Sequence, residues 1–380
     1  PEQEYFSDGI TEDLTTALSG VSHVFVIARN SAFTYKGKAV NVVDVGRELG
    51  VRYVLEGSVR KARDRVRISA QLIDATSGFH VWGEKYDRDL SDIFALQSEI
   101  TEQILAAVQV EIGEAEMARI RRRPTESLSA YDTVMRGMFH FLRFNPNDNV
   151  TARDLFQRAV ELDPGFAAAH AAIASTYTFE SGMGWSFDPT LMDRAEAAAR
   201  RSLELDPTDW PGHLAIASVS LFRGRTQQAI ASAERAIEIN PNNDLSHAIL
   251  AGALLQSRRM LPAMQATNRA VRLNPRAPSE IWVIMAYANI MVERYDEGRA
   301  LLERVWSSNP HMLMAGVGLA VQYEFMGRHD DARAIAQQIL RINPEMTAEA
   351  AFLMSTGGVQ VLSDEATAEN VAKLRLAGLP

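Results

Sequence analysis

The chain has 380 residues, more than the roughly 250 to 300 over which one hydrophobic core grows, so we expect at least two folding units. Its net charge of −9 argues against general affinity for nucleic acid or anionic membrane, and the lack of cysteine excludes disulfides, thiol catalysis and cysteine-bound zinc. No apolar run reaches the roughly 18 residues of a membrane span, and the first 30 residues lack the basic start and apolar core of a signal peptide. Because the first residue is Pro1, we interpret the sequence as part of a longer protein.

The first 112 residues combine helical and strand patterns. Apolar and polar side chains alternate over residues 51–59 and 66–72, which predicts two strands joined by a turn at Arg63-Asp64. The order of elements, α-β-α-β-β-β-α, predicts a small α/β sandwich, that is, an α+β domain of residues 1–112. The other expected elements are strands at residues 24–28 and 80–86, helices at residues 8–19, 42–49 and 93–112, and helix N-caps at Ser7, Asp8 and Ser91.

The glycines and acids of this region do not indicate catalysis. The glycines form neither a GxGxxG pattern nor a P-loop, so no phosphate cradle is expected. The first three acids named below are explained by favourable electrostatics at a helix N-terminus. The last three are explained by a solvated loop that precedes a helix. We therefore predict no catalytic, cofactor-binding or metal-binding residue in this chain. The glycines are Gly9, Gly46, Gly50 and Gly57, and the acids are Asp8, Glu12, Asp13, Asp87, Asp89 and Asp92.

The predicted hairpin is basic, and a charged linker follows the domain. No aromatic residues interleave with the basic ones, so we interpret the hairpin as a solvated strand edge and predict no nucleic-acid contact. Residues 113–126, GEAEMARIRRRPTE, predict a helix extension followed by a short hinge at Pro124. The basic residues of the hairpin are Arg60, Lys61, Arg63, Arg65 and Arg67.

Six prolines, each preceded by Asp or Asn, divide the rest of the sequence. They are Pro164, Pro207, Pro241, Pro275, Pro310 and Pro344, and from Pro207 onward they are spaced by 34, 34, 35 and 34 residues. Small residues recur at fixed offsets before them, as two helices crossing at about 8 to 10 Å require. The interval therefore predicts stacked repeats. The small residues are Ala152, Ala195, Ala229, Ala263, Gly298 and Ala332 at one offset, and Ala217, Ala251, Ala286 and Ala320 at the other.

Each interval reads as helix, turn, helix, turn, with breaks at Gly224 and Gly327 and at the prolines. This pattern resembles the tetratricopeptide repeat. The resemblance implies an all-α superhelix of about six repeats over residues 127–344, and terminal capping helices within residues 345–380. It also implies that the array binds a protein or peptide. The expected repeats are residues 127–164, 165–207, 208–241, 242–275, 276–310 and 311–344.

In the family that this array resembles, the first helix of each pair lines the concave face. The corresponding positions here are almost all uncharged, so we expect the groove to hold an apolar helix. That helix could come from a partner protein, from a second copy in a homodimer, or from this chain. The expected groove residues are Leu214, Leu221, Phe222, Leu255, Val283, Tyr287, Ile290, Met291, Val317, Val321 and Phe325.

Two further features of the array allow more than one interpretation. The second repeat has an aromatic insert, TFESGMGWSFDPT, whose residues Phe179, Trp185 and Phe187 either pack on their own repeat or form a partner-binding tip. His170, His213 and His247 stand at one position of three successive repeats, where metal binding or pH sensing would be conceivable. We interpret these histidines as core residues packed between helices, because no carboxylate recurs beside them.

Several sequence motifs of the N-terminal region carry a second resemblance. The segments EYFSDGITEDLTTAL, VGRELGVRYVLEGSVRK and VRISAQLIDATSGFHVWGEKYDRDL resemble a TolB-N-terminal-like domain that precedes tetratricopeptide repeats in bacterial class III adenylate and guanylate cyclases and in winged-helix regulators. The resemblance implies a noncatalytic regulatory module C-terminal to a catalytic cyclase domain, with a further strand before Pro1. The alternatives are the effector region of a winged-helix transcription regulator and a free-standing scaffold. In this family the module is either periplasmic, in an inner-membrane protein, or cytoplasmic.

Overall fold

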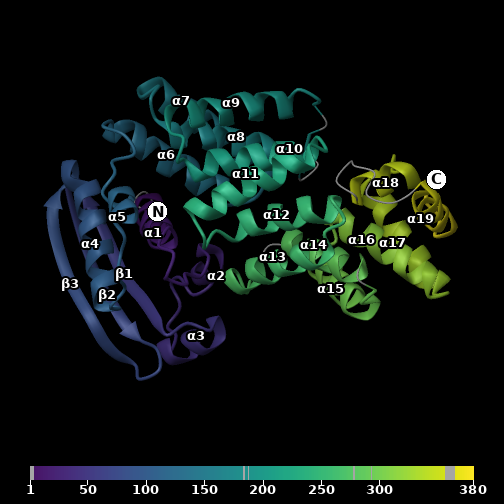
Figure 1. Ribbon diagram of the computed structural model, residues 1–380, viewed down its shortest axis with the longest axis horizontal. Helices are drawn as coiled ribbons and strands as arrows, with labels where there is room; N and C mark the ends of the chain where they lie inside the picture. The colour runs from purple at the N-terminus through teal and green to yellow at the C-terminus, as the bar shows by residue number, and fades with distance from the viewer. Residues whose placement is uncertain (1–3, 183–184, 187, 277–278, 292, 356–363) are drawn as a thin grey trace. The chain divides into compact units, whose positions relative to one another are not determined.

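The computed structural model describes residues 4–182, 185–186, 188–276, 279–291, 293–355 and 364–380 (Figure 1). The chain divides into two compact units. The first comprises Pro1–Ile216, Arg235–Asn243 and Leu273–Pro275, and the second comprises Ala217–Glu234, Asp244–Arg272 and Arg276–Pro380.

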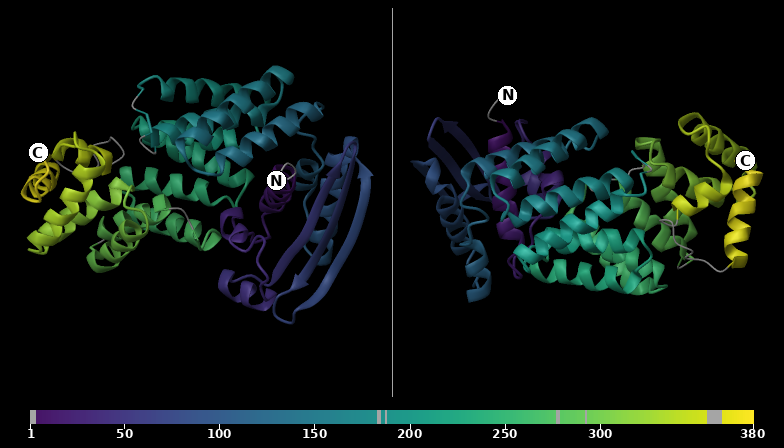
Figure 2. Two further views of the ribbon diagram at one scale, coloured as in Figure 1. Left: turned by 180° about the vertical axis from the view of Figure 1, so that it is seen from behind. Right: turned by 90° about the horizontal axis from the view of Figure 1, so that it is seen from above.

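A three-stranded antiparallel sheet forms part of the first unit. Its strands are β1 (Tyr53–Ala62), β2 (Arg65–Asp74) and β3 (Phe79–Asp89), in the order β1-β2-β3. They curve together as a ribbon (Figure 2). The turn between β1 and β2 has Arg63 at a φ of 53°, as the sequence predicted for Arg63-Asp64. In β2, alternate residues from Val66 to Leu72 are buried, which confirms the predicted alternation.

Helices α1 (Glu4–Ser19) and α4 (Ile93–Ala107) contribute to one hydrophobic core with the sheet. This core includes Ile10 and Ile100, both fully buried, together with the apolar side chains of β2. Helix α3 (Val42–Leu49) has the predicted bounds. It begins with an Asn41 side chain that accepts from the Val43 N–H at 2.9 Å, and it ends at Gly50, whose φ of 66° favours glycine.

Two local predictions for this unit were wrong. Helix α1 already includes Ser7 and Asp8, and Ser91 lies in a short 3-10 turn (Leu90–Asp92), so none of these residues is the N-cap that we expected. Residues 24–28 have no regular secondary structure and pair with no strand of the described sheet. A short helix, α2 (Arg29–Phe33), follows them. Their backbone groups bond elsewhere in the unit, as described below.

The helices of the repeats end where the Asx-Pro pairs predicted. The helix that precedes each pair stops at the residue before the Asp or Asn, as Ile342 does before Asn343. Asn343 itself is extended, with a φ of −134° and a ψ of 93°, because a following proline disfavours helical backbone. The helix pairs are α6 (Leu128–Phe141) and α7 (Pro146–Leu162), α8 (Ala167–Gly182) and α9 (Leu191–Leu205), α10 (Trp210–Phe222) and α11 (Thr226–Ile239), α12 (Asp244–Gln256) and α13 (Met260–Leu273), α14 (Ser279–Met291) and α15 (Tyr295–Ser308), and α16 (Leu313–Phe325) and α17 (His329–Ile342).

The small residues at the repeat offsets lie at helix contacts. All nine alanines are fully buried, and Gly298 is buried as well. A Cβ on Gly298 would lie 2.8 Å from the backbone oxygen of Ala286, so the α14–α15 contact leaves no room for a methyl group. The structure therefore confirms the inference from spacing to close helix packing.

Two terminal helices follow the last repeat of the second unit, as predicted: α18 (Ala348–Ser355) and α19 (Asp364–Leu376). Helix α19 packs against both α16 and α18, and its Leu374 is fully buried, as is Ala377 directly after the helix. The Ala348 N–H donates to the Pro380 carbonyl at 2.7 Å, which ties the end of the chain to the start of α18. Among the described residues, no helix has both the length and the apolarity to cross a bilayer.

Candidate partner-binding surfaces

Five of the predicted groove residues are buried within the array. Leu214, Leu255 and Val321 are each 8% exposed, and Val283 and Val317 are each 1% exposed. Side chains this enclosed stabilise the contacts between helices and present little surface to a ligand. Leu221, Tyr287 and Ile290 are half-buried, and the Met291 side chain lies outside the described residues.

Phe222 and Phe325 are the predicted groove residues with the most exposed side chains among those described. Their exposed fractions are 36% and 48%. Phe222 ends α10 and Phe325 ends α16, so both occupy the last position of a first helix. Single exposed aromatics at the same place in two repeats are candidates for contact with a partner.

The aromatic insert packs partly on its own neighbourhood. The Phe179 ring lies 5.1 Å from that of Phe141 and 5.8 Å from that of Phe144, both in the preceding repeat region. Trp185 is half-buried and donates its backbone N–H to the Glu180 carbonyl at 3.0 Å. Phe187 lies outside the described residues. Phe179 therefore joins the first two repeats through an aromatic cluster.

Two of the three histidines that recur at one repeat position, His170 and His213, form hydrogen bonds with the turn that precedes their helix. The Nε2 of His170 lies 3.2 Å from the Pro164 carbonyl oxygen, and the Nε2 of His213 lies 2.9 Å from that of Pro207. The side chains of both residues, and that of His247, are half-buried, so the interpretation as packed core was wrong. A histidine six residues after the proline reaches back over the first helical turn, because its ring nitrogen can donate to that carbonyl.

The segment after α1 contacts the turn at the end of α11. The buried Asn242 side chain donates to the Ser19 carbonyl at 3.0 Å and to the Val24 carbonyl at 2.8 Å, and accepts from the Val26 N–H at 3.5 Å. One side chain thus bonds three backbone groups, two of which, those of Val24 and Val26, belong to the segment that we expected to be a strand. The sequence signal was the extra asparagine after Asn240-Pro241.

The next Asx-Pro turn of the first unit binds the same segment. The Ala28 N–H donates to the Leu273 carbonyl at 2.7 Å. The fully buried Ser31 hydroxyl donates to the Asn274 side-chain oxygen at 2.6 Å. Two successive turns of the array therefore hold residues 19–31, which explains why this segment does not pair with the sheet.

The charged segment that we expected to be a linker is also anchored. It contains helix α5 (Glu114–Ile120). The Arg119 guanidinium donates to the Ile239 carbonyl at 2.8 Å and to the Gly20 carbonyl at 3.3 Å. Arg122 pairs with Asp206, the residue before Pro207, at 2.5 Å. Arginines thus connect this segment to the turns of two repeats.

A cluster of three polar side chains joins α1, α4 and α6. The Tyr131 hydroxyl and the Gln97 amide both donate to Oδ2 of Asp13, the latter at 2.8 Å, and the amide also lies 2.9 Å from the Tyr131 oxygen. Burial raises the pKa of Asp13 to about 6, against the opposing effect of the two donors. Burial and the Asp13 charge raise the pKa of Tyr131 well above its usual range, so the phenol stays protonated. We had assigned Asp13 to helix electrostatics, and the structure places it in this junction.

Two further acids of the N-terminal region, Asp8 and Asp87, form ion pairs. Asp8 lies 2.6 Å from the Lys36 ammonium. Asp87 lies on strand β3 rather than in a loop before a helix, and it pairs with both Arg65 and Arg67 of the basic hairpin. Hydrogen bonds from Arg67 and Arg65 lower the pKa of Asp87. These acids therefore have neighbouring cations from the same chain.

An open cavity of about 770 Å³ lies beside α4 and α5 in the first unit. Its lining includes Phe94, Ala106 and Met117, with the ion pair between Arg121 and Glu102 at its edge. The Ser98 hydroxyl in this cavity donates to main-chain carbonyls. Among the described residues, no three His, Asp or Glu side chains are grouped as a metal site would require.

Comparisons with known proteins support the repeat assignment. Residues 289–355 match the family described as tetratricopeptide repeat, and residues 223–305 match the family described as anaphase-promoting complex, cyclosome, subunit 3. The crystal structure of the APC/C hetero-tetramer Cut9–Hcn1 is similar to 72% of this chain and 52% of its own, with a TM-score of 0.50 and 16% identity. At that identity the likeness concerns the fold alone. The chain contains tetratricopeptide repeats, which form a protein-interaction module.

One curated relative adds a likeness in sequence. A protein of Rhizobium meliloti (strain 1021), named "Putative adenylate cyclase 3", is 53% identical over 174 residues. The match covers 46% of this chain and 30% of that relative, so the chain spans less than a third of the relative's length.

Proposed function

We propose that this chain is the noncatalytic regulatory region of a bacterial class III adenylate or guanylate cyclase. In this proposal residues 1–112 form the TolB-N-terminal-like domain, residues 113–126 connect it to the array, residues 127–344 bind the partner, and residues 345–380 cap the array. Support comes from the repeats and from the 53% identity to the relative named as a cyclase.

The observation that carries a regulatory role is the attachment of residues 19–31 to successive turns of the array. Asn242 and Asn274 are both buried and both bond this segment. A partner that changed the angle between the repeats would shift these two turns relative to each other. Because one short segment spans both, such a shift would break or strain its hydrogen bonds. The attachment thus supports transmission of a binding event from the array to the N-terminal domain.

We assign no catalytic residue to the chain. Asp8, Asp13 and Asp87, the acids that a metal-dependent reaction could have used, are engaged by Lys36, by Gln97 and Tyr131, or by the arginines of the hairpin. The same hairpin is a poor candidate for binding nucleic acid, because two of its arginines, Arg65 and Arg67, already face Asp87. The expected ligand is a protein or peptide helix that contacts exposed apolar residues of the first helices, with Phe222 and Phe325 as the leading contacts.

The proposal is tested in the longer protein, by measuring cyclase activity with and without the substitution Asn242→Ala. We expect this substitution to change the response of the cyclase to its partner while leaving partner affinity within about twofold. His311→Ala is the matched control. His311 directly follows Asn309-Pro310, as Asn242 directly follows Asn240-Pro241, but its side chain is exposed. Cyclic nucleotide production by the purified 380-residue chain, given ATP or GTP with Mg²⁺ or Mn²⁺, would contradict a noncatalytic role.

A further inference from the structure

An arginine stands immediately before the second helix in each of the last four repeats, that is, before α11, α13, α15 and α17. Each of these arginines is sixteen residues before the proline of its repeat, and all four belong to the second unit. A cation at a helix N-terminus opposes the helix dipole, so helix formation alone does not favour arginine at this place. The four residues are Arg225, Arg259, Arg294 and Arg328.

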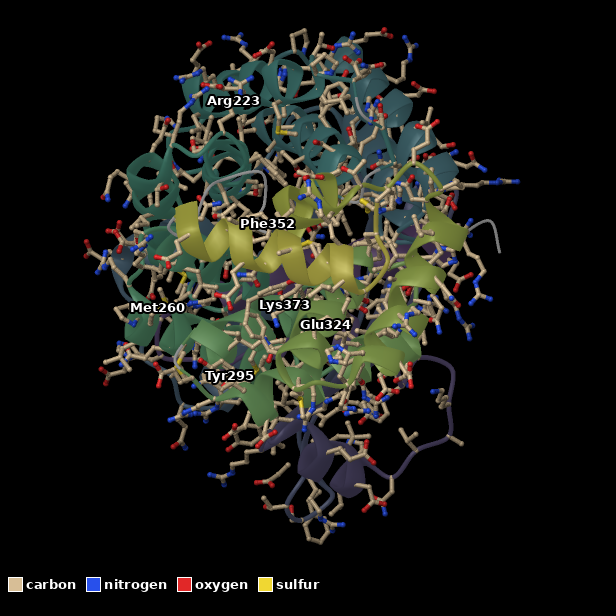
Figure 3. All side chains as sticks on the ribbon, turned by 90° about the vertical axis from the view of Figure 1, so that its right-hand side faces the viewer. Arg223, Met260, Tyr295, Glu324, Phe352 and Lys373 are labelled. Atoms are coloured by element: carbon tan, nitrogen blue, oxygen red, sulfur yellow. The ribbon has the colours of Figure 1, made fainter. Side chains whose placement is uncertain are left out.

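The four turns that carry these arginines share one backbone geometry. Each arginine N–H donates to the carbonyl five residues earlier at 2.8 or 2.9 Å, and the residue before it has a left-handed φ between 57° and 73°. That residue is Gly224 or Gly327 in two turns, but Arg258 and Glu293 in the other two. Glycine adopts this conformation without strain, so Arg258 and Glu293 are retained in a strained one. Figure 3 labels one residue in or beside each turn: Arg223, Met260, Tyr295 and Glu324.

The turns of the third and fourth repeats are basic, whereas those of the fifth and sixth are not. Residues 221–228 and 255–262 contain four arginines and no acid, and the equivalent residues 290–297 and 324–331 contain two arginines and six acids. Arg258 and Arg259 are exposed, and no acid among the described residues forms an ion pair with either. In a chain with a net charge of −9, the first two turns are therefore a local excess of positive charge.

Hydrogen bonds hold the two basic turns next to each other. The Gln256 side-chain amide donates to the Leu221 carbonyl at 3.4 Å, and its Oε1 accepts from the Thr226 hydroxyl at 3.5 Å. A Cβ on Gly252 would lie 3.2 Å from the Leu221 side chain, so α10 and α12 pack closely here. Phe222, 36% exposed, belongs to the same surface. We call residues 221–228 and 255–262 the basic turns.

We propose that the basic turns bind an acidic amphipathic helix of a partner protein, whose carboxylates pair with Arg258 and Arg259 and whose apolar face contacts Phe222. The inference rests on the proposed function, because it names the chemistry of the partner that the array binds. Charge complementarity selects this occupant, since arginine forms its strongest hydrogen bonds with carboxylates.

The charges of the four turns also orient the partner. The acids of the fifth and sixth turns repel carboxylates, so the acidic end of a partner that also reaches Phe325 lies on the third and fourth repeats. The partner lies on the ends of the first helices, where Phe222 is, and the arginines reach it from the turns. Leu261, in the first turn of α13, stays outside this contact.

The test compares two fluorescent peptides of about 18 residues, long enough to form a helix. Both carry Leu and Phe on one face, while the opposite face carries Glu in the acidic probe and Gln in the neutral probe. Each is titrated with the full chain, and binding is followed by fluorescence anisotropy. At about 50 mM salt the acidic probe should bind at least about tenfold more tightly than the neutral one, and this difference should shrink at about 500 mM salt.

The substitutions Arg258→Gly and Arg259→Gln, made together, remove two cations from the basic turns. Glycine relieves the left-handed backbone at position 258 but also makes the unfolded chain more flexible, so this paired variant should unfold at about the same urea concentration as the wild type. It should bind the acidic probe at least about tenfold more weakly and the neutral probe within about twofold of the wild type.

The matched control makes the same exchanges in the next repeat. Glu293→Gly and Arg294→Gln together relieve the same backbone conformation but remove one charge of each sign, so the net charge does not change. This control should change the affinity for both probes by less than about twofold. An effect on the acidic probe equal to that of the paired variant would show that the positive charge of the basic turns does not select the ligand, and would overturn the inference.

A further variant distinguishes failure of this inference from failure of the proposed function. Phe222→Ser should weaken both probes to the same extent, because it removes an apolar contact that both share. If it does so while the paired variant weakens neither, the array binds helices through its first helices but the basic turns do not select them. That result would overturn this inference alone. Equal affinity of the wild type for the two probes would overturn it as well.

Two other occupants are distinguished by the same paired variant. Phosphatidylserine vesicles that bind the wild type, displace the acidic probe and do not bind the variant would identify a lipid surface. Self-association of the wild type at rising concentration, abolished in the variant, would identify a second copy of the chain. Either result would overturn the assignment to an acidic partner helix.

Discussion

The junction between α1, α4 and α6 should make stability depend on pH through Asp13. Its carboxyl has a pKa of about 6 in the folded protein, against an ordinary value of 3.8. A raised pKa means that the folded state favours the protonated carboxyl. The contribution of this group is therefore fully present below about pH 4 and is lost as the pH rises through about 6.

The size of the effect follows from the difference of about two pKa units. Each unit corresponds to about 1.4 kcal/mol, so the group contributes at most about 3 kcal/mol more to stability at pH 4 than at pH 7. Asp13→Asn gives a side chain that is neutral at all of these pH values and can still accept from Tyr131 and Gln97. The variant should therefore lack this part of the pH dependence.

The assay is urea unfolding, followed by far-UV circular dichroism, of the wild type and Asp13→Asn between pH 4 and pH 8. The free energy of unfolding of the wild type, minus that of the variant, should fall by about 1 to 3 kcal/mol across this range, with its midpoint near pH 5 to 6. Thr11→Ala, at an exposed position of the same helix, should show no such trend. A difference between wild type and Asp13→Asn that does not vary with pH would refute the reasoning.

Three further substitutions probe packing, docking and the binding surface. Gly298→Ala should lower the free energy of unfolding by about 1 to 3 kcal/mol, because its Cβ would meet the immobile Ala286 carbonyl, and an unchanged urea midpoint would contradict this. Asn242→Ala should lower the free energy of unfolding by about 1 to 3 kcal/mol and should speed proteolysis within residues 19–31. His311→Ala should change neither quantity. Phe325→Ser should weaken partner binding at least about tenfold in a titration while lowering the free energy of unfolding by less than about 1 kcal/mol, and an unchanged affinity would exclude this residue from the interface.

The repeats could be predicted from the sequence because their signals are local and recur. An Asx-Pro pair stops a helix by backbone sterics alone, and a fixed offset of Ala or Gly reports a close helix crossing. Asn343 and Gly298 illustrate the two signals, and both behave in the structure as the spacing required. The alternation in β2 was similarly local, because each side chain faces either the core or solvent.

The contacts that depend on distant parts of the chain could not be predicted in this way. Residues 24–28 have a strand-like sequence, but Asn242, more than two hundred residues later, supplies their hydrogen bonds. The sequence around Asp13 indicated only an acidic residue near a helix N-terminus. Its partners Gln97 and Tyr131 lie far away in the sequence and reach it only in the folded chain. For the same reason the family geometry, carried over to the first helices of this sequence, could not separate exposed groove residues such as Phe325 from buried ones such as Val317.

The central claim is that the array binds a protein through the exposed ends of its first helices. Because the chain has no cysteine, single cysteines at Phe222, Phe325 or the exposed second-helix residue Leu261 can each carry a photo-crosslinker. The account predicts that one and the same protein is crosslinked from positions 222 and 325 and is not crosslinked from position 261. Crosslinking of that protein from position 261 alone, or equally from all three positions, would contradict it.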